Sequence, residues 1–570
     1  MIDWLGQAWD DICRNTVLFP VELAVVIFCL LFQQIPGLSI RVPALCNNWL
    51  RFLLRRRRLA VAFVFVFTLG GRFLAEPGYT IPAPGIHDEF SYLLAADTFA
   101  SGRVTNPPHA MSYFFESFHI LTHPTYMSMY PPGQGLMLAL GIKIGGHPIV
   151  GVWLSAALAC AALCWMLQGW TKPGWALTGG MIAAVRIGWF SYWANSYWGG
   201  CVSALGGALI FGAAPRLLHR PAWKHAAAFG AGLLILVNTR MWEGSIVALA
   251  VTIWLIVAIA RRHGWKRFTP ILVPIALILV PGAAGMAYYN WRVTGNPLRP
   301  PYLENRNQYE TYGSFFWNTP RTGRLYNHPM LRKFYVEWEN YPAQSGYLPL
   351  QIEKPRRIWV FFFGPALTVS LFGLWRSWRS RRLLLPWIVL GAFTAAHLLV
   401  QWQLIPHYAG PITAVLYLLM VEGFRGLSIW RRRRQGAGIH WVRAAVAAVA
   451  VMALFRSVAP SLGVNVYREY TLPWYSYGLH ANFHRLKIEE RLTGMQGKHL
   501  VLVSYGPEHN TAQEWVYNRA DIDGAPVVWA RHVADPSRLI ALLQYFRERR
   551  VWIIYPDSNP GQLTDYRGGL

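Results

Sequence analysis

The sequence predicts an all-α polytopic membrane protein of about twelve transmembrane helices, followed by a small C-terminal extracytoplasmic α/β domain. Its 570 residues are 54% hydrophobic and 15% aromatic but only 14% charged, a composition unlike that of a soluble globular protein. Many apolar runs approach the roughly 20 residues that cross a hydrocarbon core. The basic residues concentrate in alternate connecting segments, as in proteins that cross a membrane repeatedly.

Apolar runs of roughly 17 to 22 residues recur along the chain and predict its spans. The predicted spans are 17–35, 59–75, 148–168, 175–192, 198–214, 226–242, 245–260, 271–290, 357–375, 384–402, 409–424 and 441–458. A shorter run at 133–146 contains Lys143 and several glycines. It predicts an interfacial or re-entrant helix.

The net charge of +26 is distributed by side of the membrane. Six connecting segments together contain 24 Lys plus Arg and no Asp or Glu: 36–58, 169–174, 215–225, 261–269, 376–382 and 425–443. The positive-inside rule places these segments in the cytoplasm. Because basic runs beside spans contact anionic headgroups, we expect membrane lipids as partners and no nucleic acid.

The opposite, extracytoplasmic side receives the loops 76–132 and 291–356 and the tail after about residue 459, whose 12 Lys plus Arg nearly balance 11 acids. We therefore expect a multi-pass protein integral to the cell (inner) membrane, with its C-terminal domain outside the cytoplasm. The predicted domains are an N-terminal helix with a basic cytoplasmic loop (1–58), a transmembrane domain with external loops (59–460) and the external α/β domain (461–570).

The tail has the pattern of a small α/β module. The apolar runs 498–506, 526–531 and 549–557 are bounded by turn residues and predict strands. The segment 535–549 has helical spacing and a good N-cap residue. Strands that alternate with helices favour a parallel or mixed sheet.

Asp88 and Glu89 stand side by side in the first external loop, within HDEFSYLLAADTFASG. One interpretation is structural: Asp88 caps a helix that begins at Glu89 and ends near Gly102. The other is chemical. Neighbours on a helix point about 100° apart, so the two acids cannot face each other like the carboxylates of a glycosidase. One acid would then do the chemistry, and the other would orient it, bind a metal or accept a hydrogen bond from substrate.

This acidic pair follows an early predicted span, and YPPGQGLMLALG (130–141) begins 42 residues after Asp88. The arrangement resembles the integral-membrane glycosyltransferases of the GT-C superfamily, in particular the bacterial relatives of protein O-mannosyltransferases and of the aminoarabinose transferase. The resemblance covers residues 59 to about 460 and leaves out the tail. It implies a GT-C-like fold and inverting transfer of a sugar from a polyprenyl-phosphate donor to a lipid, glycan or protein acceptor on the extracytoplasmic face.

The resemblance also implies roles for individual residues. Asp88 becomes the general base and Glu89 its catalytic partner. Arg240 and His407 end predicted spans on the external side and become candidates for binding the donor phosphate. The remaining substrate-binding candidates are Tyr130, Glu243 and Asn195, the last of which stands where relatives often place another acid. No cofactor is certain, and a divalent cation on Asp88 or Glu89 stays open.

Each candidate has a plainer interpretation. Arg240 could extend to the membrane interface or pair with Glu243, His407 could be a packing residue, and tyrosines are common in aromatic belts at membrane interfaces. Two other classes of function also stay open. One is a polytopic transporter, for which buried mid-span charges and internal repeats would be expected. The other is a noncatalytic envelope-assembly subunit that acts through its C-terminal domain.

Overall fold

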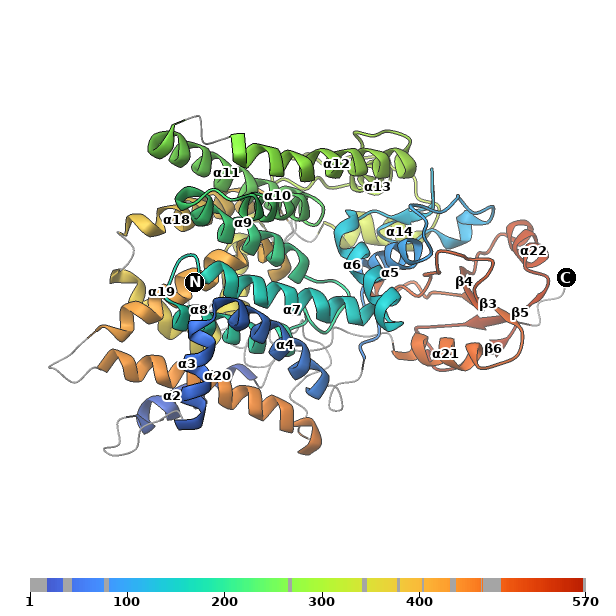
Figure 1. Ribbon diagram of the computed structural model, residues 1–570. Helices are drawn as coiled ribbons and strands as arrows, with labels where there is room; N and C mark the ends of the chain where they lie inside the picture. Colours follow the sequence, from blue (N-terminus) through green and yellow to red (C-terminus); the bar gives the residue numbers. More distant parts are fainter. Residues whose placement is uncertain are drawn as a thin grey trace. The chain divides into compact units, whose positions relative to one another are not determined.

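The computed structural model describes residues 18–33, 44–75, 81–264, 269–340, 346–376, 380–401, 404–430, 437–462, 464 and 483–566. The chain forms two compact units, coloured by sequence in Figure 1. The helical unit comprises Met1–Ile81, Val152–Gly282 and Tyr347–Leu479. The mixed unit comprises Pro82–Gly151, Ala283–Gly346 and His480–Leu570.

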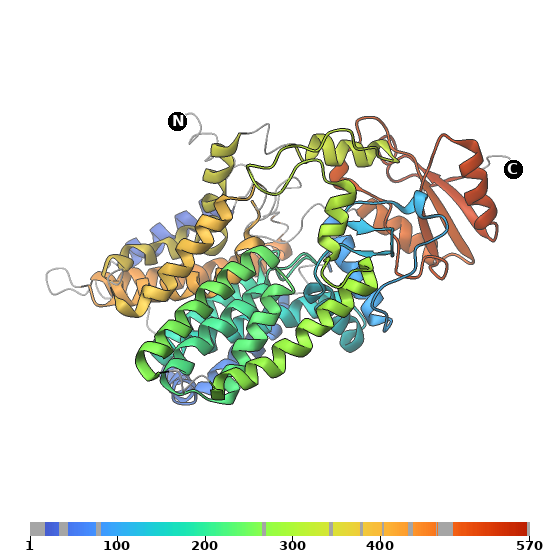
Figure 2. The ribbon, with the colours of Figure 1, turned by 90° about the horizontal axis from the view of Figure 1, so that it is seen from above.

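The helical unit consists of helices, most of which are apolar. Their bounds are α2 Leu18–Phe32, α3 Ala44–Arg55, α4 Arg57–Ala75, α7 Pro148–Leu167, α8 Pro173–Ala183, α9 Cys201–His219, α10 Trp223–Val237, α11 Met241–His263, the first part of α12 Thr269–Thr294, α16 Tyr347–Phe362, α17 Gly364–Thr368, α18 Leu384–Leu398, α19 Thr413–Ser428 and α20 Ala437–Val458. The helices α9, α10 and α11 lie side by side, as the green helices of Figure 2 show. Small residues allow some close contacts, since a Cβ added to Gly373 would lie 1.9 Å from the carbonyl oxygen of Gly423 on α19.

Six helical segments of the described residues are long and apolar enough to cross a membrane: Pro148–Leu167, Cys201–His219, Met241–Arg262, Pro270–Thr294, Pro406–Ser428 and Gly438–Val458. A bent pair, Tyr347–Phe362 with Gly364–Trp375, makes up to seven. The helices α2 and α10 are apolar but shorter. The prediction of a mostly helical, polytopic protein is therefore confirmed.

One predicted span, 357–375, is wrong as a continuous helix because α16 and α17 meet at 95°. Gly364 lies at the break with a φ of 53°, and Pro365, which follows it, has no N–H to donate. Glu22 Oε1 accepts the N–H of Ala366 at 3.1 Å and a hydrogen bond from Arg186 Nη1 at 3.0 Å. The buried carboxylate of Glu22, paired with the partly buried Arg186, thus accepts a backbone N–H at the break.

The mixed unit combines the two loops that the sequence predicts to be external with the tail. Its elements are α5 His87–Ala100, β1 Ile120–Leu121, β2 Met127–Ser128, α6 Pro132–Gly145, α13 Pro301–Tyr309, α14 Pro329–Arg332, the π-helix η5 Lys333–Trp338, α21 Phe483–Thr493, β3 Lys498–Val503, β4 Val527–Arg531, α22 Pro536–Tyr545, β5 Arg549–Ile554 and β6 Thr564–Asp565. The predicted segment 133–146 corresponds to α6.

The tail contains the predicted mixed sheet, with strand order β4-β3-β5-β6. The strand β3 is parallel to β4 and β5, and β6 is antiparallel to β5. Alternate side chains of the strands face opposite ways, so α22 packs on one face and α21 on the other, as Figure 1 shows. As expected, Asp535 caps α22 by accepting the N–H of Ser537 at 3.0 Å.

The sheet face that carries α22 also packs against the segment 82–132, which contains α5. Phe90 of α5 stacks on Tyr517 of the tail, with ring centroids 4.1 Å apart and planes inclined by 5°. Asp97 Oδ2, further along α5, accepts the N–H of Ala520 at 2.8 Å. The loop and the tail therefore share one apolar core, and the compact units divide the chain at other places than the domain boundaries predicted at 58 and 460.

Candidate active site

The N-terminus of α5 separates the roles of the two adjacent acids. The helix begins at His87, and its N-cap position is Ile86, whose side chain has no capping oxygen. Glu89 Oε2 accepts the backbone N–H groups of Gly85 at 2.9 Å and Ile86 at 3.4 Å. Glu89 thus makes the reciprocal bond of a capping box. The structural interpretation of Asp88 as the N-cap is wrong, because Asp88 is the second residue of the helix.

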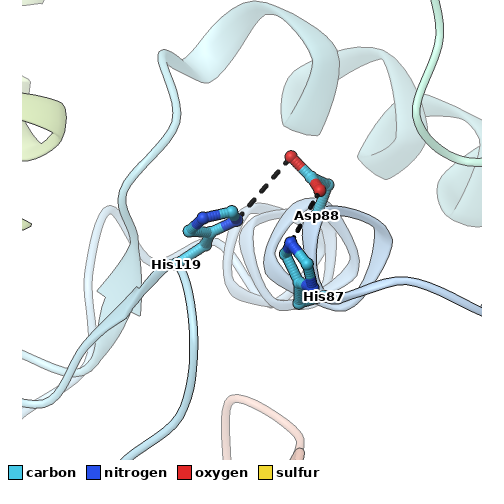
Figure 3. A group of neighbouring side chains, drawn as sticks. All are labelled: His87, Asp88 and His119. Carbon is cyan, nitrogen blue, oxygen red and sulfur yellow. Dashed lines mark ion pairs between the residues drawn. The ribbon is translucent and has the colours of Figure 1, made fainter. Parts of the chain in front are cut away.

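Asp88 lies in a cluster of polar side chains from three segments of the mixed unit. The hydroxyl of Tyr130 donates to Asp88 Oδ1. His87 Nε2 lies 3.3 Å from Asp88 Oδ2, and His119 Nδ1 lies 3.7 Å from Oδ1. Figure 3 shows the two imidazole rings directed toward the carboxylate. Asp88 is itself only 9% exposed.

Burial determines the charge of the two histidines. It lowers the pKa of His87 below its usual value, against the opposing effect of the Asp88 charge. It also lowers the pKa of His119 to about 3, and the neighbouring His87 adds to this shift. Both rings are therefore neutral near pH 7. The carboxylate is approached by neutral donors and acceptors instead of by an imidazolium ion.

The same three side chains could hold a metal ion. One ligand atom from each of His87, Asp88 and His119 lies within 4.8 Å of the others. Neutral imidazoles and a carboxylate are ligands that suit zinc and similar divalent ions. The second nitrogen of a metal-bound histidine usually donates to an acceptor, whereas the buried Nδ1 of His87 has no hydrogen-bond partner among the described residues. The three ligand atoms therefore suit a metal ion, whereas the lack of an acceptor for the second nitrogen of His87 within the described part of the chain does not.

An aromatic wall lies beside the cluster. Phe334 and Trp338 are one turn apart on the π-helix η5 and stack at 4.9 Å. Their ring centroids lie 4.9 and 5.9 Å from that of His87. The sequence analysis missed His119, Phe334 and Trp338. A histidine in the same loop as Asp88, 76–132, was the available signal for the first, and nothing in the loop 291–356 singled out the other two.

The phosphate candidates Arg240 and His407 lie together in the helical unit. The guanidinium of Arg240 lies 4.6 Å from the ring centroid of Tyr408, the residue after His407. His407 is fully buried, and its Nδ1 lies 3.2 Å from the hydroxyl of Tyr192, which also accepts the His407 N–H at 3.0 Å. The structure therefore brings these two candidates into one polar and aromatic cluster.

Three further residues belong to the helical unit. Arg240 is the N-cap residue of α11, and Glu243 is buried in the first turn of this helix. Glu243 interacts electrostatically with Lys354. Lys354, which the sequence analysis missed, is buried and donates to the carbonyls of His397 at 2.8 Å and of Val400. The amide of Asn195 donates to the Trp189 and Ser191 carbonyls at 3.0 and 2.8 Å, so it supports local backbone after the π-helix that ends at Trp189.

Comparisons with known proteins support the fold. No family model and no curated protein sequence matches the chain. ArnT from Cupriavidus metallidurans in the apo state matches with a TM-score of 0.50 and 13% identity, over 88% of this chain and 94% of ArnT. ArnT bound to undecaprenyl phosphate matches at 0.48 with 13% identity, over 87% and 94% of the two chains. An oligosaccharyltransferase from Archaeoglobus fulgidus, in complex with Zn and sulfate, matches at 0.45 with 11% identity, over 87% of this chain and 67% of its own.

The match to apo ArnT shows that this chain has the fold of a GT-C membrane glycosyltransferase. The fold resemblance inferred from the acidic pair and the YPPGQG segment is confirmed. At 13% identity the match shows the fold alone. The activity has to be argued from the site.

Proposed function

We propose that this protein, which has a GT-C fold, transfers a sugar from a polyprenyl-phosphate donor to an acceptor hydroxyl with inversion at the anomeric carbon. The observation that carries the proposal is the burial of Asp88 among Tyr130, His87 and His119 at the start of α5. A buried carboxylate between neutral side chains is typical of a catalytic base. The fold shared with ArnT supports the choice of reaction.

Asp88 acts as the general base. Its carboxylate accepts the proton of the acceptor hydroxyl while that oxygen attacks the anomeric carbon and the bond to the phosphate oxygen breaks. The sugar leaves with the acceptor, the proton stays on Asp88, and the polyprenyl phosphate departs as an anion. Such proton transfer contributes roughly 10²- to 10⁴-fold to the rate. Direct displacement inverts the anomeric centre and needs no covalent enzyme intermediate.

The leaving phosphate requires positive charge and hydrogen-bond donors. Arg240 can present two N–H groups to phosphate oxygens, and His407 and Tyr192 lie in the same cluster. Undecaprenyl phosphate, which ArnT binds, is a ligand of the proposed class. We assign Arg240 and His407 to this phosphate, with Glu243 as a supporting residue.

The site faces the extracytoplasmic side in this proposal. The six basic connecting segments belong to the cytoplasm, and the twelve predicted spans alternate between the two sides. Most of these spans coincide with a helix of the helical unit, such as α7, α9 and α11. The loop that contains Asp88 and the tail then lie on the external side, where a lipid-linked sugar can meet an acceptor from the cell envelope.

A bound metal is the alternative use of the same cluster. When bound by His87, Asp88 and His119, a divalent ion would stabilise negative charge near the reacting phosphate or hydroxyl. Chelation separates the two possibilities, because a proton acceptor keeps its function after a metal is removed. Activity that is lost with chelator and restored by added zinc or manganese would assign the cluster to metal binding.

The proposal is tested with purified full-length protein in lipid nanodiscs. The substrates are a panel of undecaprenyl-phosphate-linked hexoses and pentoses, with water or small hydroxyl compounds as acceptors. We expect release or transfer of one of these sugars, with the inverted anomeric configuration in the product. A protein that binds none of the donors and releases no sugar would contradict the proposal and favour a noncatalytic role.

A further inference from the structure

The ring of Tyr130 is buried by packing, and its hydroxyl makes hydrogen bonds within the candidate site. The ring stacks on Tyr92, with centroids 4.4 Å apart and planes inclined by 20°. Both residues are buried. The backbone N–H of Tyr130 donates to Ser128 Oγ at 3.1 Å. The sequence analysis assigned Tyr130 to substrate binding. Because the ring is packed against Tyr92, the hydroxyl is the part of Tyr130 that contacts the candidate site.

The Tyr130 hydroxyl joins two members of the candidate site. It donates to Asp88 Oδ1 and lies 3.0 Å from His119 Nδ1. A phenol has a single proton, so the bond to His119 requires the imidazole to be the donor. The hydrogen bonds therefore run from His119 Nδ1–H to Tyr130 and from Tyr130 to Asp88.

His119 is held in an unusual backbone conformation. Its φ of 59° is the one positive value at a non-glycine residue in the described part of the chain. Such a conformation is disfavoured by roughly 1–3 kcal/mol and persists where surrounding bonds hold it. The His119 carbonyl accepts Ser91 Oγ at 2.7 Å and the Met129 N–H at 3.1 Å. Ser91 Oγ lies also 2.7 Å from Ser128 Oγ.

These bonds close a ring that starts and ends on α5. Ser91 is three residues after Asp88 on this helix. From Ser91 the contacts pass through the carbonyl and the side chain of His119 to Tyr130, and from Tyr130 back to Asp88. The carboxylate of Asp88 is thereby fixed in rotation relative to the helix that carries it.

We propose that Tyr130 is a positioning residue, whose hydroxyl fixes the orientation of the Asp88 carboxylate. We propose further that the left-handed turn at His119 keeps the Tyr130 hydroxyl where it can make this hydrogen bond. This inference rests on the proposed function and deepens it. The acceptor hydroxyl then binds beside a carboxylate of fixed orientation, so less conformational entropy is lost on reaching the reactive geometry.

The test compares three variants of the full-length protein in nanodiscs, with the undecaprenyl-phosphate-linked sugar that the wild type turns over. Tyr130→Phe keeps the stacked ring and removes the hydroxyl. We expect kcat to fall by roughly 10- to 100-fold, with KM for the donor within about twofold of wild type. Ser91→Ala, which removes one of the two hydrogen bonds to the His119 carbonyl, is expected to lower kcat by about threefold or more in the same manner.

Thr98→Val is the matched control. Thr98 is another buried hydroxyl residue of α5, and its Oγ1 donates to the Leu94 carbonyl at 2.8 Å and accepts from Asn106 Nδ2 at 2.8 Å, outside the ring of bonds described above. We expect this variant to keep the wild-type kcat. Folded Tyr130→Phe with wild-type kcat would overturn the inference. If Tyr130→Phe does not fold, an unchanged kcat in Ser91→Ala would overturn it.

A structural measurement separates this inference from the proposed function. In an experimental structure of Tyr130→Phe we expect Asp88 to occupy more than one side-chain rotamer, whether or not a donor has been found. A single rotamer identical to that of the wild type would overturn the positioning role. Absence of turnover in the wild type, with Asp88 disordered in the variant, would contradict the proposed function alone.

Discussion

Glu89 accepts the backbone N–H of Gly85 at 2.9 Å, and this bond gives Glu89 a role different from that of the adjacent Asp88. Glu89 closes the N-terminus of α5 from its third position. Asp88, one residue earlier, meets Tyr130 instead. A helix cap and a candidate base are therefore supplied by neighbouring residues of one turn.

The first prediction concerns this cap. Glu89→Ala removes the acceptor for two backbone N–H groups, so we expect the free energy of unfolding to fall by about 0.5–2 kcal/mol. Glu89→Gln keeps an acceptor oxygen and should lose less stability and little turnover. Thermal melting and turnover of both variants check this. Complete inactivity of a well-folded Glu89→Gln protein would instead show that the negative charge of Glu89 takes part in the reaction.

The second prediction concerns the phosphate. Arg240→Ala should raise KM for the donor by roughly 10- to 100-fold, because a charge-assisted hydrogen bond to phosphate is lost, and should leave KM for the acceptor within about twofold. His407→Ala should act in the same direction but less strongly. Arg262→Ala, an exposed arginine near the other end of α11, is the control and should behave as wild type. Unchanged donor kinetics in both variants would remove Arg240 and His407 from the site and direct the search to Arg292, Arg299 and Arg72.

The third prediction concerns orientation in the membrane. Single cysteines at Ser101 and Ser537, both exposed, should react with a membrane-impermeant reagent added to intact cells, in a background without native cysteines. A cysteine at the exposed Lys224 should react only after permeabilisation. Ser91 is unsuitable as a labelling site because it is fully buried. Labelling of Lys224 in intact cells, with protection of Ser101, would reverse the proposed orientation.

The fourth prediction concerns pH. Burial raises the pKa of Glu339 from 4.5 to about 7, against the opposing charge of Arg306. Between these values the unfolded chain releases a proton that the folded protein keeps, so stability falls as pH rises through this window, by up to about 3 kcal/mol. Glu339→Gln should therefore melt higher than wild type at pH 8, with a smaller difference at pH 5. An equal difference at both pH values would contradict the assignment of a buried proton to Glu339.

Much of the fold follows from the sequence, because the thickness of the bilayer sets the length of each apolar run. The strands of the tail also follow, since apolar runs such as those of β3 and β5 are bounded by turn residues. The break near Phe363 was missed because hydropathy does not report backbone direction. Gly364 and Pro365 become informative only when the angle between α16 and α17 is known.

The candidate site is only partly readable from the sequence. Asp88 and Tyr130 could be selected from local motifs, but their hydrogen bond depends on how α5 and α6 pack. His119 lies in the site because of a left-handed turn, and no local sequence pattern predicts that turn. The tail reaches α5 through the stack of Phe90 on Tyr517, a contact between residues far apart in the chain. Contacts of this kind follow from tertiary packing and not from periodicity.

The most direct test of the account is the turnover of Asp88→Asn on a donor and acceptor that the wild type uses. Asparagine keeps the shape of the side chain and an oxygen that accepts from Tyr130, and Glu89 still caps α5, so expression and melting temperature should stay near wild type. An amide cannot take the proton of the acceptor hydroxyl, so we predict that turnover falls by about 100-fold or more. Wild-type turnover in a folded Asp88→Asn protein would contradict the assignment of Asp88 as the catalytic base.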